Sequence, residues 1–228
     1  MSIAEKLQTV AENVSKVYNA GYEKGKSEGG DNPLNYATFE SGYIFYKAVF
    51  PENYELDFNI TGNTGSISTM RWFAQSNVYK VKIGIDRNYK AIAANYMFQN
   101  CANLVSVKIK NDSLCLNNCT YLFDGCTALE SIDGVIDISQ CGGTNSMFNK
   151  CYALKEVRFV SQSINANILF DSCADLSVDS INSIINGLAD MTGKTSCTLF
   201  VHGNVFSRMT VEQKTIIASK NWTLSAVA

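Results

Sequence analysis

The residues with the greatest potential for chemistry are a single histidine, His202, and eight cysteines. A cysteine nucleophile needs a neighbouring base, and nothing in the sequence couples His202 to any thiol, so we expect a turn or surface histidine. Cys115, Cys119 and Cys126 have metal-like spacing but no clear fourth ligand for zinc, and we expect Cys126 to pack in the core. Walker, dinucleotide-binding, Gly-x-Ser-x-Gly and His-Glu-x-x-His motifs do not occur. We therefore predict no enzyme activity, no metal and no cofactor.

Four of the cysteines belong to a repeated pattern, [Met/Leu]-Phe-x-x-Cys-x-x-Leu. Its phenylalanines recur at intervals of 25, 25 and 22 residues. The four copies are Met97–Leu104, Leu122–Leu129, Met147–Leu154 and Leu169–Leu176. An earlier, degenerate copy is interpreted as Trp72, Gln75 and Val78. Four apolar or thiol positions that match four times make this repeat the main organising feature of the chain.

The length of the repeat falls in the window of about 20–29 residues that is typical of leucine-rich repeats. Each copy predicts one coil of a solenoid, in which Leu-x-x-Val-x-Ile is a short strand of a parallel sheet and Phe-x-x-Cys is the return turn. Stacked coils would place Phe98, Phe123, Phe148 and Phe170 in an aromatic column. The cysteines beside this column are expected to be small buried hydrophobes, and a reducing site of synthesis argues against disulfides.

The Phe-x-x-Cys-x-x-Leu-x-x-[Val/Ile] unit resembles the BspA-like leucine-rich repeat of bacterial surface and phage-borne proteins, over roughly residues 70–176. The chain departs from that family where Lys110-Asn111 and Val160-Ser161 stand in place of Ile-Pro. The flanks at Ser2–Val14, Ser180–Leu188 and Lys220–Leu224 resemble (pro)phage structural, tail-associated proteins of gut Firmicutes. The resemblance implies a leucine-rich-repeat solenoid with short parallel strands and an α/β C-terminal cap, preceded by an N-terminal amphipathic helix.

The predicted organisation has five parts: an N-terminal heptad helix (1–25), a flexible linker (26–34), an N-terminal cap of irregular strands (35–70), the repeats (71–176) and a C-terminal cap (177–228). The heptad seam consists of Ile3, Leu7, Val10, Val14 and Val17. Such a seam, with its wide apolar stripe, favours self-association as a trimer or larger bundle; the alternative is that the helix folds back as a cap on its own solenoid. In the C-terminal cap, Ser177 and the capping box Thr210–Gln213 predict helix starts, and Cys197–Val201 and Trp222–Leu224 predict strands.

A solenoid offers a long sheet with an outward row of side chains for binding. The candidate binding residues in that row are Lys80, Lys82, Lys108, Lys110, Glu156 and Arg158. They could attract an acidic glycopolymer or the carboxylates of a partner protein, or they could be solvated sheet surface. The alternative recognition edge consists of loop residues: Tyr89, Tyr96, Asn117, Asn118, Tyr121 and Tyr152.

Composition and charge narrow the function further. The formal net charge of −2 gives no electrostatic case for nucleic acid, and the sequence has no stretch of about 20 apolar residues and no secretory signal pattern. We therefore expect assembly in the bacterial cytoplasm and a virion component that contacts other virion proteins and a host surface glycopolymer or protein. The alternative is a host-encoded cell-surface adhesin of the BspA-like type.

Overall fold

The computed structural model describes residues 45–50, 52–60, 65–85, 89–111 and 113–227. Over these residues the chain is mainly β, with many short parallel strands and few helices. The predicted heptad helix with its five seam residues, the linker and the first part of the predicted N-terminal cap lie outside the described residues.

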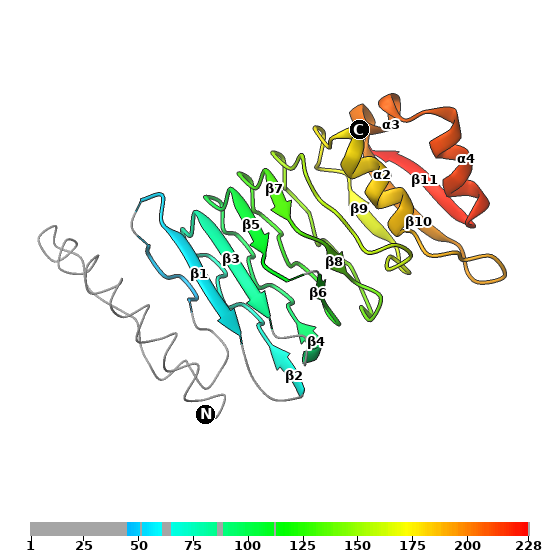
Figure 1. Ribbon diagram of the computed structural model, residues 1–228. Helices are drawn as coiled ribbons and strands as arrows, with labels where there is room; N and C mark the ends of the chain where they lie inside the picture. The colour runs from blue at the N-terminus through cyan, green and yellow to red at the C-terminus, as the bar shows by residue number, and fades with distance from the viewer. Residues whose placement is uncertain (1–44, 51, 61–64, 86–88, 112, 228) are drawn as a thin grey trace, which may run out of the picture.

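Four strands form one parallel sheet, in the order in which they occur along the chain. They are β1 (Glu55–Ile60), β3 (Lys80–Ile85), β5 (Ser106–Ile109) and β7 (Ser131–Asp133). Val107 pairs with Val81 on one side and with Ile132 on the other, and all three are buried. Each repeat, with its strand and its return turn, therefore forms one layer of a stack, and Figure 1 shows the strands of successive layers side by side.

Two shorter ladders lie past the C-terminal ends of the first sheet's strands, toward the lower right in Figure 1. They pair β2 (Gly65–Ser68) with β4 (Tyr89–Ala93) and β6 (Leu114–Cys115) with β8 (Ile136–Asp137), again in parallel. A third parallel sheet at the C-terminal end has the order β11-β10-β9. Its strands are β9 (Ile168–Phe170), β10 (Cys197–His202) and β11 (Trp222–Val227).

A column of phenylalanine rings runs through the core, as the repeat predicts. Neighbouring rings stack with centroids 5.3 Å apart for Phe98 and Phe123, 5.8 Å for Phe123 and Phe148, and 4.9 Å for Phe148 and Phe170. None of these four side chains is more than 2% exposed. Offset stacking over this distance adds attraction beyond the burial of apolar area.

The column extends one layer further than the four copies of the repeat, and the residue that continues it is Phe73, not Trp72. The Phe73 ring stacks on Phe98 at 5.0 Å and on Phe45 at 4.8 Å. The degenerate copy was aligned one residue too early because Phe73 is followed by Val78 after five residues, whereas Phe98 is followed by Leu104 after six.

Each return turn bends at two residues in the left-handed backbone conformation. These residues recur two positions before and two positions after Phe73, Phe98, Phe123 and Phe148: Arg71, Gln75, Tyr96, Asn100, Tyr121, Gly125, Ser146 and Lys150. All but Gly125 carry side chains, so this conformation is costly. The backbone N–H of Asn100 donates to the Asp124 carbonyl of the next layer at 2.7 Å, and Tyr96 donates likewise to Thr120 at 3.0 Å. Such bonds between layers hold the turns in this conformation.

Helix α2 (Val178–Gly187) ends the first sheet. Beyond β7, the backbone N–H groups of Val157 and Phe159 point to where another strand would lie. They donate instead to the hydroxyls of Ser180 and Ser183, at 2.9 and 3.0 Å. These serines stand three residues apart on one face of the helix, so the helix satisfies the edge of the sheet with side chains.

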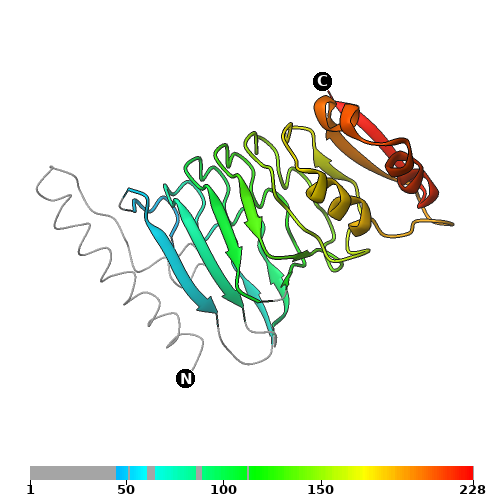
Figure 2. The same ribbon diagram turned by 45° about the horizontal axis from the view of Figure 1, so that its top comes forward.

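The predicted starts of the C-terminal helices are confirmed. Ser177 is the N-cap of α2, and Thr210 and Gln213 form a capping box that opens α4 (Val211–Ser219). The short helix α3 (Gly203–Arg208) lies between β10 and α4. Figure 2 shows these helices at the C-terminal end of the stack. No helix among the described residues is both long and apolar enough to cross a membrane.

The stacked column leads to a stability prediction. Phe123 has a phenylalanine on both sides, so Phe123→Ala should lower the free energy of unfolding by about 3–5 kcal/mol, through lost burial and a cavity between layers. Tyr152→Ala is the matched control, because Tyr152 is 56% exposed and its loss should cost less than about 0.5 kcal/mol. Urea unfolding followed by circular dichroism measures both. Equal effects of the two substitutions would contradict the column as a core element.

Candidate binding face on the parallel sheet

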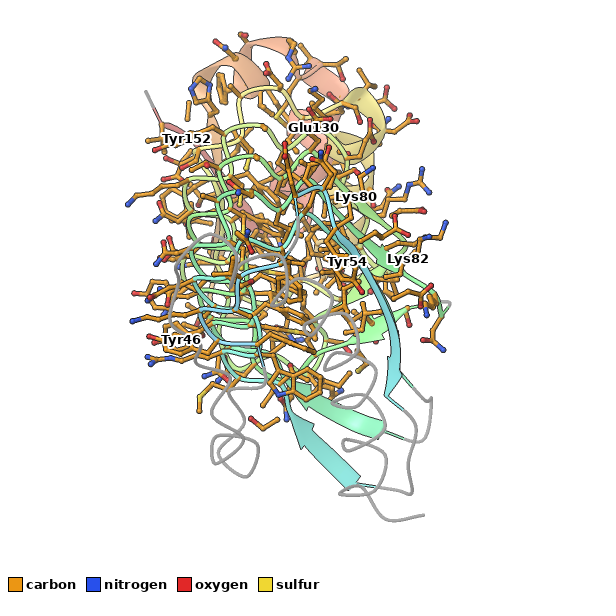
Figure 3. The ribbon with its side chains drawn as sticks, turned by 90° about the vertical axis from the view of Figure 1, so that its left-hand side faces the viewer. Tyr46, Tyr54, Lys80, Lys82, Glu130 and Tyr152 are labelled. Carbon is orange, nitrogen blue, oxygen red and sulfur yellow. The ribbon has the colours of Figure 1, made fainter. Side chains whose placement is uncertain are left out.

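The outward side of the β1-β3-β5-β7 sheet, with the segment 155–158 beside it, forms one charged face. Its cations are Lys80, Lys82, Lys108, Lys110, Lys155 and Arg158, and its carboxylates are Glu55, Asp57, Glu130, Asp133 and Glu156. The alternation along each strand creates this face, because Val81 and Ile83 point into the core, whereas Lys80 and Lys82, which alternate with them, point outward. In Figure 3, Lys80 and Lys82 lie on the side of the molecule opposite Tyr46 and Tyr152.

The structure brings all six predicted binding residues to this face, but carboxylates of neighbouring layers pair with several of them. Lys82 forms an ion pair with Glu55, and that carboxylate raises the pKa of the Lys82 ammonium group. Lys108 lies level with Asp133 on the adjacent strand, with Nζ and Oδ2 2.8 Å apart. With six cations, five carboxylates and four ion pairs among them, the face is nearly neutral and is not the basic surface that the lysines alone indicate.

The ion pair between Lys110 and Asp57 spans two strands. Lys110 directly follows β5 and Asp57 lies on β1, so the lysine side chain must cross β3. The residue of β3 level with Lys110 is Gly84, since Ile83 pairs with Ile109. Gly84 has no side chain to block the crossing, and it is buried.

Glu156, a predicted binding residue, also has an intramolecular role. Its Oε2 accepts hydrogen bonds from the hydroxyls of Ser177 at 3.0 Å and Ser180 at 3.3 Å. Ser177 is the N-cap of α2, where the helix dipole favours a negative charge. Glu156 therefore helps to fasten the helix that ends the sheet.

Two cations on the face are less engaged. Arg158 is exposed, and its guanidinium has no ionic or hydrogen-bond partner among the described residues. The Nζ of Lys80 lies 5.3 Å from the centroid of the adjacent Tyr79 ring and forms no ion pair within the described ranges. At these two groups an anionic partner would meet the least competition from the protein's own carboxylates.

Sequence analysis missed the carboxylates of Glu55 and Asp57. The segment 55–60 was interpreted as part of an irregular cap, but it is a regular strand in register with β3. Its alternation, Glu55-Leu56-Asp57-Phe58, is the signal that could have revealed an outward acidic row.

The alternative recognition edge carries stacked rings on the return turns. The Tyr96 and Tyr121 rings stack with centroids 5.1 Å apart, and the Arg71 guanidinium lies 5.0 Å from the centroid of the Tyr96 ring. Tyr152 stands out from the surface, 56% exposed. The rings of Tyr96 and Tyr121 thus cover each other and leave little aromatic surface for a ligand, whereas Tyr152 is available.

The cysteines of the repeat are buried as predicted, and they also act as hydrogen-bond donors. The thiols of Cys101, Cys126 and Cys151 donate to the carbonyl oxygen of the phenylalanine one layer earlier, at 2.9, 3.0 and 3.2 Å. Burial raises the pKa of the Cys101 thiol to about 12 and also raises the pKa values of Cys126 and Cys151. These thiols are protonated at neutral pH and bind layers together, which is a structural role.

His202 lies at the N-terminus of helix α3. Its Nδ1 accepts a hydrogen bond from the Asn204 backbone N–H at 3.1 Å, so the imidazole caps the helix. In the part of the chain that the structure describes, no three histidine, cysteine, aspartate or glutamate side chains gather as a metal site.

Comparisons of this chain with protein-family models, with curated proteins and with solved structures find no match.

The buried thiols predict that alkali destabilises the protein. The pKa of Cys101 is about 12 in the folded chain, whereas an unfolded cysteine titrates near about 8.5, so the folded state keeps a proton that the unfolded state releases. Each such thiol should lower the free energy of unfolding by up to about 1.4 kcal/mol per pH unit above pH 9. Urea unfolding between pH 8 and pH 11, under a reductant, measures the slope. Ser76 stands 25 residues before Cys101, at the matching position of the preceding layer, so Cys101→Ser introduces a residue that this position already accepts. The substitution should reduce the slope, and an unchanged slope would refute the assignment of a raised pKa to the Cys101 thiol.

Proposed function

We propose that this chain is a non-enzymatic binding protein, built as a leucine-rich-repeat solenoid of the BspA-like type, that serves as a tail-associated or fibre-like component of a phage or prophage virion. The observation that carries the solenoid is the unbroken phenylalanine column from Phe45 to Phe170, one ring in each layer. A column of this kind is what one coil per repeat, with all coils in the same register, would produce.

A binding role is supported by the construction of the charged face. Parallel strands fix the spacing of its side chains, and ion pairs between layers hold Lys82, Lys108 and Lys110 in defined positions. A surface whose side chains are already ordered loses little conformational entropy when a partner binds. Arg158 and Lys80 add positive charge that has no carboxylate partner among the described residues, and we assign to them the first contact with an acidic glycopolymer or an acidic protein segment of the host surface.

A place in a virion is supported by the resemblance of the flanks to (pro)phage structural proteins. The heptad seam from Ile3 to Val17 would hold copies together, or attach each copy to the particle, while the repeats project. A second candidate is a host-encoded cell-surface adhesin. It is favoured by the Phe-x-x-Cys-x-x-Leu repeat itself, whose resemblance extends to bacterial surface proteins.

One fractionation distinguishes the two candidates. Cultures of the source bacterium are treated with a DNA-damaging agent to induce prophages, and particles are separated on a density gradient and probed with an antibody to this protein. The virion assignment predicts that the protein bands with particles, and that a version lacking residues 1–30 stays at the top of the gradient. Protein found on the surface of uninduced cells, and absent from particles, would favour the adhesin.

The binding face has a test of its own. Purified protein is sedimented with isolated cell walls of the source bacterium at low and high salt. Lys108→Glu should weaken binding about tenfold at 50 mM NaCl and much less at 500 mM, because exposed charges are screened by salt.

The matched control for this binding test is the swap Lys108→Asp with Asp133→Lys, which preserves both the net charge and the pairing of adjacent strands. The swap should bind within about threefold of the unmodified protein. If Lys108→Glu binds as well as the swap at low salt, this face is not the binding surface, whatever the gradient shows about particles.

A further inference from the structure

Two cysteines outside the repeat lie in direct contact. Cys119 follows β6 and Cys141 follows β8, and their sulfur atoms are 3.0 Å apart. Both are buried, with Cys119 fully inaccessible and Cys141 5% exposed. Among the described residues, no other pair of cysteine sulfurs is in hydrogen-bond contact.

The cysteines of the repeat have a different environment. Each points its thiol at a phenylalanine carbonyl of the preceding layer, which directs the sulfur toward the backbone. Cys119 instead contacts a second thiol: it donates toward Cys141 as well as toward the Gly143 carbonyl at 3.4 Å, while Cys141 donates to the Leu116 carbonyl at 3.3 Å. The interval of 22 residues between Cys119 and Cys141 places them in adjacent layers.

The backbone around the pair fits a covalent bridge. The Gly142 N–H donates to the Asn117 carbonyl, so the two chain segments are already hydrogen-bonded neighbours. Neighbouring strands lie about 4.8 Å apart, within the range of about 4.4–6.8 Å that joins the Cα atoms of disulfides. A side chain at Gly142 would meet no heavy atom within 4 Å, and this residue is exposed beside Cys141. Of the two thiols, Cys141 is therefore the nearer to solvent.

We infer that Cys119 and Cys141 form an oxidation site at which a peroxide converts the two thiols into a disulfide that joins adjacent layers. The Cys141 sulfur attacks one peroxide oxygen, the O–O bond breaks, and a sulfenic acid and one water molecule result. The Cys119 sulfur then displaces the hydroxyl group from the Cys141 sulfur. The S–S bond forms, the S–O bond breaks, and the hydroxide leaves as a second water with the Cys119 proton. Two thiols are oxidised and one peroxide is reduced.

The reaction should be slow and its product durable. The neighbouring Cys141 thiol and burial raise the pKa of Cys119, so little thiolate is present at neutral pH to react. The same burial excludes bulky thiols that would reduce the bridge. The inference does not depend on the proposed function, since the contact exists whatever the protein binds.

The test uses the full-length protein and hydrogen peroxide. After oxidation the protein is unfolded and alkylated, and six of its eight cysteines should take the label, with all eight labelled after treatment with a phosphine reductant. Digestion with trypsin and a glutamate-specific protease cuts at Lys110, Glu130 and Lys150. Mass spectrometry should find peptides 111–130 and 131–150 joined, and the melting temperature of the oxidised protein should rise by about 5–10 °C.

Three variants identify the partners within these peptides. Cys119→Ser and Cys141→Ser should each abolish the joined peptides, whereas Cys115→Ser should retain them. Cys115 is the matched control because it is half-buried and because Cys141 lies close enough to it to contribute to the raised pKa of the Cys115 thiol. Eight labelled cysteines after oxidation of the unmodified protein would overturn the inference, and so would a link that is lost in Cys115→Ser. The unmodified protein decides the first point even if a variant fails to fold.

Discussion

Constant register between layers is the constraint on which the rest of the structure depends. Backbone N–H groups at the left-handed turn positions donate to the next layer, as Asn100 does to Asp124 and Gly125 to Asn149. Once these bonds are made, a residue can meet only its counterpart one repeat away. Phenylalanine then stacks on phenylalanine, each repeat thiol meets a carbonyl, and Lys108 lies level with Asp133 of the next strand. These contacts offset the strain of the left-handed turns. They also fix the register, because a shift by one residue would move the inward side chains of a strand to its outer face.

A parallel sheet built in this way has no internal reason to stop, since its last strand exposes unpaired N–H groups. Ser180 and Ser183 supply the two acceptors that a further strand would have provided. Ser180 is fully buried, and its hydroxyl also donates to the Lys155 carbonyl. A single hydroxyl thus satisfies both an N–H donor and a carbonyl acceptor at the edge of the sheet. Glu156 accepts from the serines at the start of the same helix, which ties a residue of the charged face to the end of the sheet. Substitutions at Glu156 would therefore disturb stability as well as any binding.

The parts of this fold that the sequence predicts are those that repeat at a fixed interval. Phe98, Phe123 and Phe148 are 25 residues apart and were placed correctly, whereas Phe73 was missed because its layer is one residue shorter between the phenylalanine and the next apolar position. Helix starts at Ser177 and Thr210 were also predictable, because capping is local chemistry.

The candidate site was harder to predict because its interactions join residues far apart in sequence. The outward lysines follow from strand alternation, but their partners depend on reach across layers. Lys110 finds Asp57 only because Gly84 lies between them, and no local pattern reveals this. The contact between Cys119 and Cys141 was not predicted, for a related reason. These residues lie outside the repeat motif, so a comparison of the copies does not align them.

The arrangement of charges along the stack determines what kind of partner the face could select. Exposed ion pairs contribute little to stability, about 0.2–1 kcal/mol each, so Lys82 and Lys108 could exchange their carboxylates for those of a ligand at small cost. An acidic glycopolymer can pair with Lys80 and Arg158, but along the rest of the face it must also approach Glu55 and Asp133. A partner that presents opposite charges in the reverse order would pair with both, and such patterned surfaces confer specificity more than affinity. Arg158, without a carboxylate of its own in the described structure, gives the pattern a positive end, so a partner would be bound in one direction along the stack.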